Sequence, residues 1–131
     1  MIFEHFALNV ERPVEAANWY VENCEMKIVK GSEKPPYAHF LADKTGRLVI
    51  EIYKNDSADK INLKEKHPLE FHFAFMVKNA EHVKNKLLSA GAGLEEELRL
   101  DDGSHLVMLR DPFGIPLQIC QRGVPMMDIE L

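Results

Sequence analysis

A turn and the strand that follows it, near the C-terminal end, decide the fold of this chain: Asp111-Pro-Phe-Gly114 leads into Ile115-Pro-Leu-Gln-Ile-Cys-Gln121. The same combination occurs earlier, where Asp43-Lys-Thr-Gly46 leads into Arg47-Leu-Val-Ile-Glu-Ile-Tyr53. Asp and Gly at these spacings are typical of tight turns, and runs of apolar and branched residues are typical of strands. The two turns are 68 positions apart. Their similarity suggests that one structural unit occurs twice.

Each half of the chain reads as a strand, a helix and three further strands. The expected elements of the first half are a strand over Ile2–Asn9, a helix over Pro13–Cys24, and strands over Met26–Lys30, Tyr37–Ala42 and Arg47–Tyr53. Those of the second half are a strand over Glu70–Val77, a helix capped by Asn79 that ends at Ala90 and Gly91, and strands over Leu94–Leu100, Ser104–Arg110 and Ile115–Gln121. The helix ends at Cys24 and Gly91 are 67 positions apart, which agrees with the turns to one residue and indicates a tandem duplication.

The chain is expected to form a single domain over residues 1–131, because either half alone would bury too little apolar surface to be stable. Module one covers about 1–54, and module two covers about 69–121. The polar segment 55–68 between them is expected to be a solvated linker in which nothing suggests chemistry. The tail, 122–131, is either disordered or covers an apolar surface of a partner subunit.

The composition is that of an ordinary globular protein. The 131 residues include 16 Lys and Arg, 21 Asp and Glu and only two cysteines, and 46% are hydrophobic. A net charge of −5 without a basic stripe argues against nucleic acid and anionic membranes as partners. The first residues lack the pattern of a signal peptide, and no segment is apolar enough to span a bilayer. A cytoplasmic location is therefore expected.

Four polar residues interrupt apolar strand segments: His5, Glu51, His72 and Gln118. Both histidines, and likewise Glu51 and Gln118, are 67 positions apart, so equivalent positions of the two halves carry groups that can bind a metal. A carboxylate in the middle of a strand is costly to bury unless it is paired or bound to a metal. Two imidazoles, a carboxylate and an amide oxygen form a mixed donor set that suits Zn, Fe(II), Mn, Co or Ni.

Strand alternation predicts which face these residues occupy. In Phe71-His72-Phe73-Ala74-Phe75 the three phenylalanines share one face, suited to packing under the helix, and His72 lies on the other. By the same rule Ile50 and Ile52 point to the helix, and Glu51 points to the more open face. The candidate ligands are therefore expected on the faces away from the helices.

The chain resembles the vicinal oxygen chelate superfamily from Ile2 to about Gln121. The likeness rests on His5 in the first strand, Trp19-Tyr20 late in the first helix, Leu48-Val-Ile-Glu-Ile52, and the turn Asp111-Pro-Phe-Gly114. The resemblance implies an α+β fold in which two tandem βαβββ modules form a cupped, partly closed mixed β-sheet with the helices outside. It also implies a divalent transition metal (Zn, Ni, Co, Mn or Fe) bound inside.

Compared with glyoxalase I, a family member, the resemblance implies metal ligands at His5, Glu51, His72 and Gln118. Gln118 departs from the pattern, because that position in glyoxalase I is a glutamate that also serves as the proton-transfer base. An amide cannot take a proton at neutral pH. Glu51 is therefore the expected catalytic residue. Either Glu51 or a metal-bound hydroxide would act as the base.

Four further residues are candidates for contacts with the substrate. Tyr53 and Cys120 have the strand parity of Glu51 and Gln118 and are expected to form pocket walls. His39 is expected either to line the pocket, where it could act as an acid or base, or to be an ordinary half-exposed histidine. His105 is expected either at a cavity rim or simply as a polar residue beside the Asp101-Asp102-Gly103 turn.

The leading hypothesis is a metal-dependent enzyme of the lyase, isomerase or epimerase type. It would act on a small molecule that binds the metal through neighbouring oxygens, and proton transfer beside a carbonyl is the expected reaction. A metal-free protein that binds a small molecule or antibiotic, as bleomycin-resistance proteins do, is the alternative, and an Fe(II) dioxygenase is a weaker one. The family resemblance also implies a homodimer.

Overall fold

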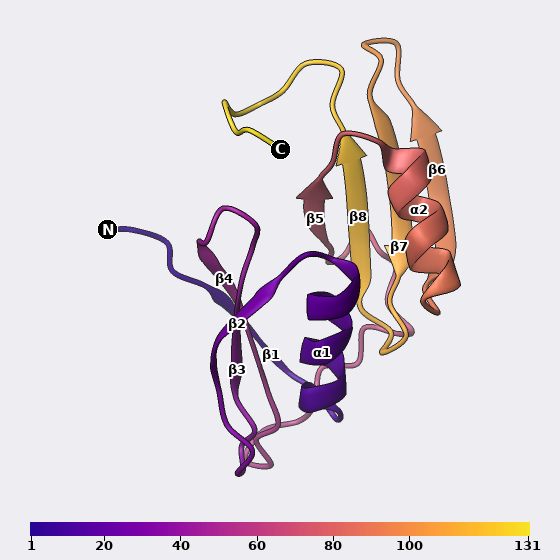
Figure 1. Cartoon of the computed structure of the whole chain (residues 1–131). Helices are drawn as coiled ribbons and strands as arrows, with labels where there is room; N and C mark the ends of the chain where they lie inside the picture. Colours follow the sequence, from indigo (N-terminus) through magenta and orange to yellow (C-terminus); the bar gives the residue numbers. More distant parts are fainter. The chain divides into compact units, whose positions relative to one another are not determined.

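The computed structural model describes residues 1–131 and has an α+β fold of eight strands and two helices (Figure 1). The chain divides into two compact units, Met1–Ile61 and Asn62–Leu131. The first contains β1 (Phe6–Asn9), α1 (Pro13–Asn23), β2 (Lys27–Gly31), β3 (His39–Ala42) and β4 (Leu48–Tyr53). The second contains β5 (Phe73–Met76), α2 (Ala80–Ser89), β6 (Gly93–Arg99), β7 (His105–Arg110) and β8 (Pro116–Gln121). No helix has the length and apolar character that crossing a membrane requires.

The first unit is a four-stranded mixed sheet in the order β1-β4-β3-β2. β1 runs parallel to β4, and the other two pairs are antiparallel. Helix α1 starts with Pro13 in its first turn, where a missing N–H costs nothing. Its buried Ala16, Ala17 and Tyr20 face the apolar side of this sheet, to which β4 contributes the fully buried Ile50 and Ile52. Burial of these side chains stabilises the unit through the hydrophobic effect.

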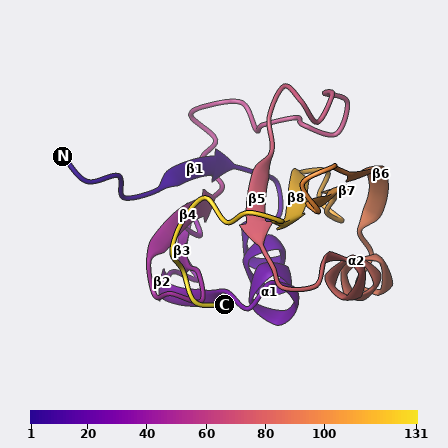
Figure 2. The same ribbon diagram turned by 90° about the horizontal axis from the view of Figure 1, so that it is seen from above.

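The second unit repeats this arrangement in the order β5-β8-β7-β6. Helix α2 lies along one face of the sheet (Figure 2) and is capped by Asn79, whose side chain accepts the N–H of His82 at 2.9 Å. The predicted cap is thus confirmed. Each unit forms its own open sheet, and neither sheet is closed into a barrel.

Strand register confirms the predicted duplication. Ala7 pairs with Glu51 between β1 and β4, and Ala74 pairs with Gln118 between β5 and β8. Both members of the second pair lie 67 positions beyond those of the first, the offset expected from the sequence. The two modules therefore agree in register as well as in the order of their elements.

The two turns that suggested the duplication also share their hydrogen bonds. In each, the backbone of the Asp pairs with the residue four positions on, at 2.9 Å, and its side chain accepts the N–H two positions on, also at 2.9 Å. Their glycines, Gly46 and Gly114, both have a positive φ, of 85° and 89°. Glycine adopts this conformation without the steric cost that other residues meet.

The first strand of each module is shorter than expected. β1 begins at Phe6 instead of Ile2, and β5 begins at Phe73 instead of Glu70. His5 and His72 therefore lie immediately before their strands. Apolar residues continued the strand pattern in the sequence, but the ladder hydrogen bonds that define a strand depend on the partner strand as well.

Candidate functional site

His5 and Glu51 lie together in the first unit. Their Nε2 and Oε2 atoms are 3.3 Å apart, and their side chains are 24% and 22% exposed. Strand geometry explains the contact: Ala7 pairs with Glu51, and His5, two residues before Ala7, points to the same face. The sequence pattern predicted this face, and most apolar residues of β4 lie on the other one.

Both ring nitrogens of His5 have a carboxylate neighbour. Nδ1 lies 2.8 Å from Oε2 of Glu4, opposite the nitrogen that faces Glu51. The ring also meets the edge of Phe40, with centroids 5.6 Å apart. A histidine that binds a metal through one nitrogen commonly donates its other N–H to a carboxylate, which fixes the ring orientation. The surroundings of His5 are suited to that role.

His72 and Gln118 occupy the equivalent positions of the second unit. Nδ1 of His72 lies 3.0 Å from the carbonyl oxygen of Pro68, so it donates its proton there and leaves the lone pair on Nε2. Gln118 pairs with Ala74 as Glu51 pairs with Ala7. Both side chains are half-buried. The structure thus gives each unit a histidine and an oxygen donor in the same register.

Tyr53 and Cys120 share the faces of Glu51 and Gln118, as their strand parity predicted. The thiol of Cys120 donates to Oε1 of Gln118 across 3.1 Å. Burial raises the pKa of Cys120, which favours the protonated thiol that this contact requires. Tyr53 is half-buried and Cys120 is buried.

His39 lies on the face opposite Glu51. It pairs with Ile52, whose side chain is fully buried, while its neighbour Phe40 pairs with Glu51. Only 6% of His39 is exposed, and its Nδ1 donates to the carbonyl of Tyr37 at 2.7 Å. The structure therefore does not bring His39 to the candidate ligands of the first unit.

His105 lies on the helix-covered face of the second sheet. It pairs with Gln121, so it points away from the face of Gln118. Its Nε2 lies 2.6 Å from Oε1 of Glu97, and its side chain is 3% exposed. The structure therefore places His105 in contact with Glu97 and not beside Gln118.

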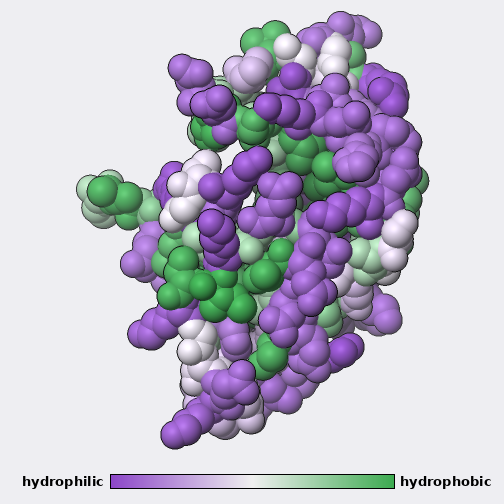
Figure 3. Space-filling view, viewed as in Figure 1, coloured by the Kyte–Doolittle hydropathy of each residue, from purple (hydrophilic) through white to green (hydrophobic).

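Glu81, Glu97 and His105 form a second group with metal-binding side chains, whose ligand atoms lie within 4.8 Å of one another. The ammonium of Lys84 already lies among them, 2.9 Å from Glu81 and 3.0 Å from Glu97. Hydrogen bonds from Lys84 and then His105 lower the pKa of Glu97, and bonds to Glu81 and Glu97 raise the pKa of Lys84. Figure 3 shows a mainly hydrophilic surface over α2. The group is an ion-pair network in which Lys84 supplies the cation.

The network makes stability depend on pH in a stated direction. Because the folded protein lowers the pKa of Glu97 below its ordinary 4.5, the stabilisation is present above that pH and is lost as the pH falls through the folded value. We therefore expect Tm to fall less between about pH 5 and pH 3 in Glu97→Gln than in the natural chain. Scanning calorimetry across this range measures the difference. Glu96→Gln is the control, because this neighbour has no ion pair, and an equal decline in all three proteins would contradict the prediction.

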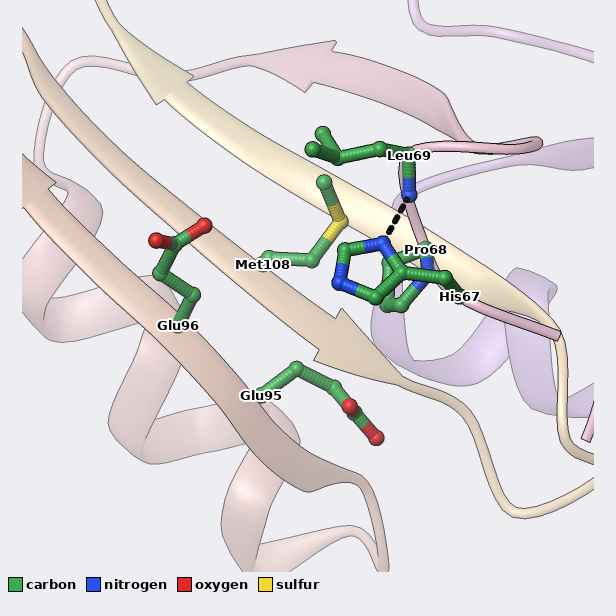
Figure 4. Close-up of a pocket in the computed structure, with 6 residues that line it drawn as sticks. All are labelled: His67, Pro68, Leu69, Glu95, Glu96 and Met108. Atoms are coloured by element: carbon green, nitrogen blue, oxygen red, sulfur yellow. Dashed lines mark hydrogen bonds between the residues drawn. The ribbon is translucent and has the colours of Figure 1, made fainter. Parts of the chain in front are cut away.

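A cavity of about 320 Å³ lies in the second unit. It is lined by His67, Pro68, Leu69, Glu95, Glu96 and Met108 (Figure 4). None of these residues was singled out in the sequence, where 55–68 was interpreted as a linker without chemistry. One sequence feature could have pointed to them: the run Glu95-Glu96-Glu97 lies within a predicted strand but does not alternate between apolar and polar residues.

Comparison with known proteins identifies the family. The model of the glyoxalase/bleomycin resistance protein/dioxygenase superfamily matches residues 2–119. A search of curated proteins finds no match.

Several solved structures share the fold. Lactoylglutathione lyase from Agrobacterium tumefaciens is 15% identical, with a TM-score of 0.68, and the match covers 96% of this chain and 97% of that one. A glyoxalase family protein from Enterococcus faecalis is 23% identical, with a TM-score of 0.67 and coverages of 92% and 97%. TnmS3, an antibiotic binding protein from Streptomyces sp. CB03234, is 14% identical, with a TM-score of 0.66 and coverages of 93% and 96%. These similarities show the fold, and the family model matched over residues 2–119 shows that the chain belongs to the glyoxalase/bleomycin resistance protein/dioxygenase superfamily.

Proposed function

We propose that this chain is a metal-dependent enzyme of the glyoxalase type, in which His5, Glu51, His72 and Gln118 hold a divalent transition metal. The observation that carries the proposal is the contact between Nε2 of His5 and Glu51 at 3.3 Å, together with the same register for Gln118 in the second unit. Two modules that each present a histidine and an oxygen donor have the residues for a four-ligand set.

The residues fit a divalent ion chemically. Nδ1 of His5 faces Glu4 and Nδ1 of His72 faces the carbonyl of Pro68, so Nε2 of each ring is the nitrogen suited to ligation. When bound, the metal would supply Lewis-acid polarisation of a substrate carbonyl. Glu51 is the one carboxylate of the set and is our candidate for the group that moves a proton next to that carbonyl.

The proposed substrate is a small molecule with oxygens on neighbouring atoms, and Tyr53 and Cys120 would form part of the wall around it. Lyase, isomerase and epimerase reactions share this proton transfer. The homodimer and the cytoplasmic location expected from the sequence stay predictions. TnmS3 has this fold and binds an antibiotic, so metal-free binding of a small molecule is the competing function.

Metal content tests the proposal. Elemental mass spectrometry of protein purified without a His tag is expected to find about one equivalent of a transition metal in the natural chain. Glu51→Gln and His72→Ala each remove a proposed ligand, and each should lower the metal content per chain by about tenfold or more. Glu97→Gln is the matched control, because it alters the other histidine–glutamate contact, and it should keep the metal.

Two results would contradict the proposal. Protein that stays empty after incubation with Zn, Ni, Co, Mn and Fe(II) would favour the binding-protein function. Metal lost from Glu97→Gln and retained in Glu51→Gln would move the site to the Glu81, Glu97 and His105 group. Iron as the bound metal would instead favour oxygen activation, the weaker alternative.

A further inference from the structure

The cavity of the second unit depends on an irregularity in β6. The register between β6 and β7 shifts between Leu94 and Glu96, so Glu95 is an extra residue on the bulged strand. Glu96 then pairs with Met108, while Glu97 points to the opposite face and contacts His105. The bulge therefore gives two consecutive glutamates access to the cavity, which regular alternation would not do.

Only one of these two carboxylates has a cation. Nε of Arg110 donates to Oε1 of Glu95 at 2.8 Å. The same guanidinium also donates to the carbonyls of Leu63, Gly114 and Lys66, which hold it in place. Glu96 pairs with Met108 through its backbone, but its carboxylate has no ion pair and no hydrogen bond. The cavity thus carries one uncompensated negative charge.

The other walls are apolar or neutral. Met108, Pro68 and Leu69 present carbon and sulfur to the cavity (Figure 4). Nδ1 of His67 accepts the N–H of Leu69 at 3.1 Å, so in the neutral ring Nε2 carries the proton. A cavity with an apolar wall, one carboxylate that lacks a cation and one N–H donor matches a ligand that has carbon atoms, a positive charge and a hydrogen-bond acceptor.

We propose that this cavity binds an organic ammonium ion, with the charge against Glu96 and the carbon atoms against Met108, Pro68 and Leu69. The fold does not demand a glutamate here. The equivalent row of paired residues in the first unit runs from Ala7 through Glu51 and Phe40 to Lys30, so its last position has the opposite charge.

The position of the cavity connects it to the proposed metal ligands. Gln118 pairs with Met108, and Met108 pairs with Glu96, so the three lie side by side on one face. Neighbouring strands are about 4.8 Å apart, which puts Glu96 roughly 10 Å from Gln118. His72 also donates to Pro68, a wall of the cavity. We infer that the ammonium group belongs to the substrate, a step that rests on the proposed function.

Benzylammonium is a suitable probe, because it combines one positive charge with an apolar ring. The full chain is first treated with EDTA and then titrated with benzylammonium while its amide chemical shifts are recorded. The shifts of the cavity residues are expected to give a dissociation constant of about 1 mM. Benzyl alcohol and benzoate, which lack the positive charge, should bind at least about fivefold more weakly. Glu96→Gln should lower the affinity for benzylammonium by about the same factor.

Asp101→Asn is the matched control. It removes one negative charge from the turn of the same hairpin, five positions after Glu96 and beyond the end of β6. Its affinity for benzylammonium should equal that of the natural chain. Equal binding by Glu96→Gln, or equal binding of benzyl alcohol, would overturn the cation site.

The metal proposal can fail separately. Glu51→Gln, which changes a proposed ligand of the first unit and no residue of the cavity, should lose metal and still bind benzylammonium in EDTA-treated protein. If the chain takes up no metal and still binds benzylammonium in a way that requires Glu96, the cation site is supported and the proposed metal-dependent activity is rejected. If the chain holds one metal and Glu96→Gln binds benzylammonium as well as the natural chain does, the metal site is supported and the cation site is rejected.

Discussion

Asp111→Ala is expected to lower the free energy of unfolding by about 3 kcal/mol, whereas Asp43→Ala should lower it by only about 1 kcal/mol. Oδ1 of Asp111 accepts the N–H groups of Phe113 and Ile115, at 2.9 and 2.8 Å. Asp111 and Ile115 are buried, so the alanine variant leaves a buried donor without a partner. Asp43 makes the equivalent bond to the exposed Thr45, whose N–H water can reach.

The different surroundings of the two turns explain the expected contrast. Lys64 packs on the Asp111 turn so closely that a Cβ on Gly114 would lie 2.9 Å from its Cβ, while a Cβ on Gly46 would meet nothing within 4 Å. Urea denaturation of both variants measures the difference, and hydrogen exchange at Ile115 and Thr45 locates it. Equal losses in the two variants would mean that burial of the turn has no effect on its hydrogen bonds.

The order of the helices and strands could be predicted from the sequence because it depends on local sequence signals. Apolar periodicity, the Asn79 cap and the two Asp and Gly turns each depend on a few adjacent residues. The 67-residue offset then linked the two halves, and the register of Ala7 with Glu51 and of Ala74 with Gln118 agrees with it. Duplication therefore made one long-range feature readable from spacing alone.

The rest depended on pairing between strands. Alternation placed Glu51 correctly relative to Ile50 and Ile52, because all three share one strand. It could not place His39, whose face follows from its register opposite Ile52 on another strand. Nor could it reveal the bulge at Glu95, which changes the face of every later residue in β6. The cavity at Glu96 was missed for that reason.

The contact at the start of the C-terminal tail leads to the second large effect. Gly123→Ala is expected to lower the free energy of unfolding by about 2 kcal/mol, because the added Cβ would lie 1.8 Å from the carbonyl oxygen of Asp102 and 2.7 Å from its carbon. Backbone atoms cannot move aside as a flexible side chain can. The tail must therefore shift, and its hydrogen bond from the Gly123 N–H to Oγ of the buried Ser104, at 3.0 Å, is lost.

Gly93→Ala, in β6, provides the matched comparison. A Cβ at Gly93 would have no atom within 4 Å, and its φ is not positive, so alanine should raise the free energy of unfolding by about 0.5 kcal/mol through the lower entropy of the unfolded chain. Urea denaturation compares the two variants, and hydrogen exchange at Gly93 and residue 123 reports local opening. If Gly123→Ala were as stable as Gly93→Ala, the tail would not pack on the turn at Asp102, and its first residues would tolerate any side chain.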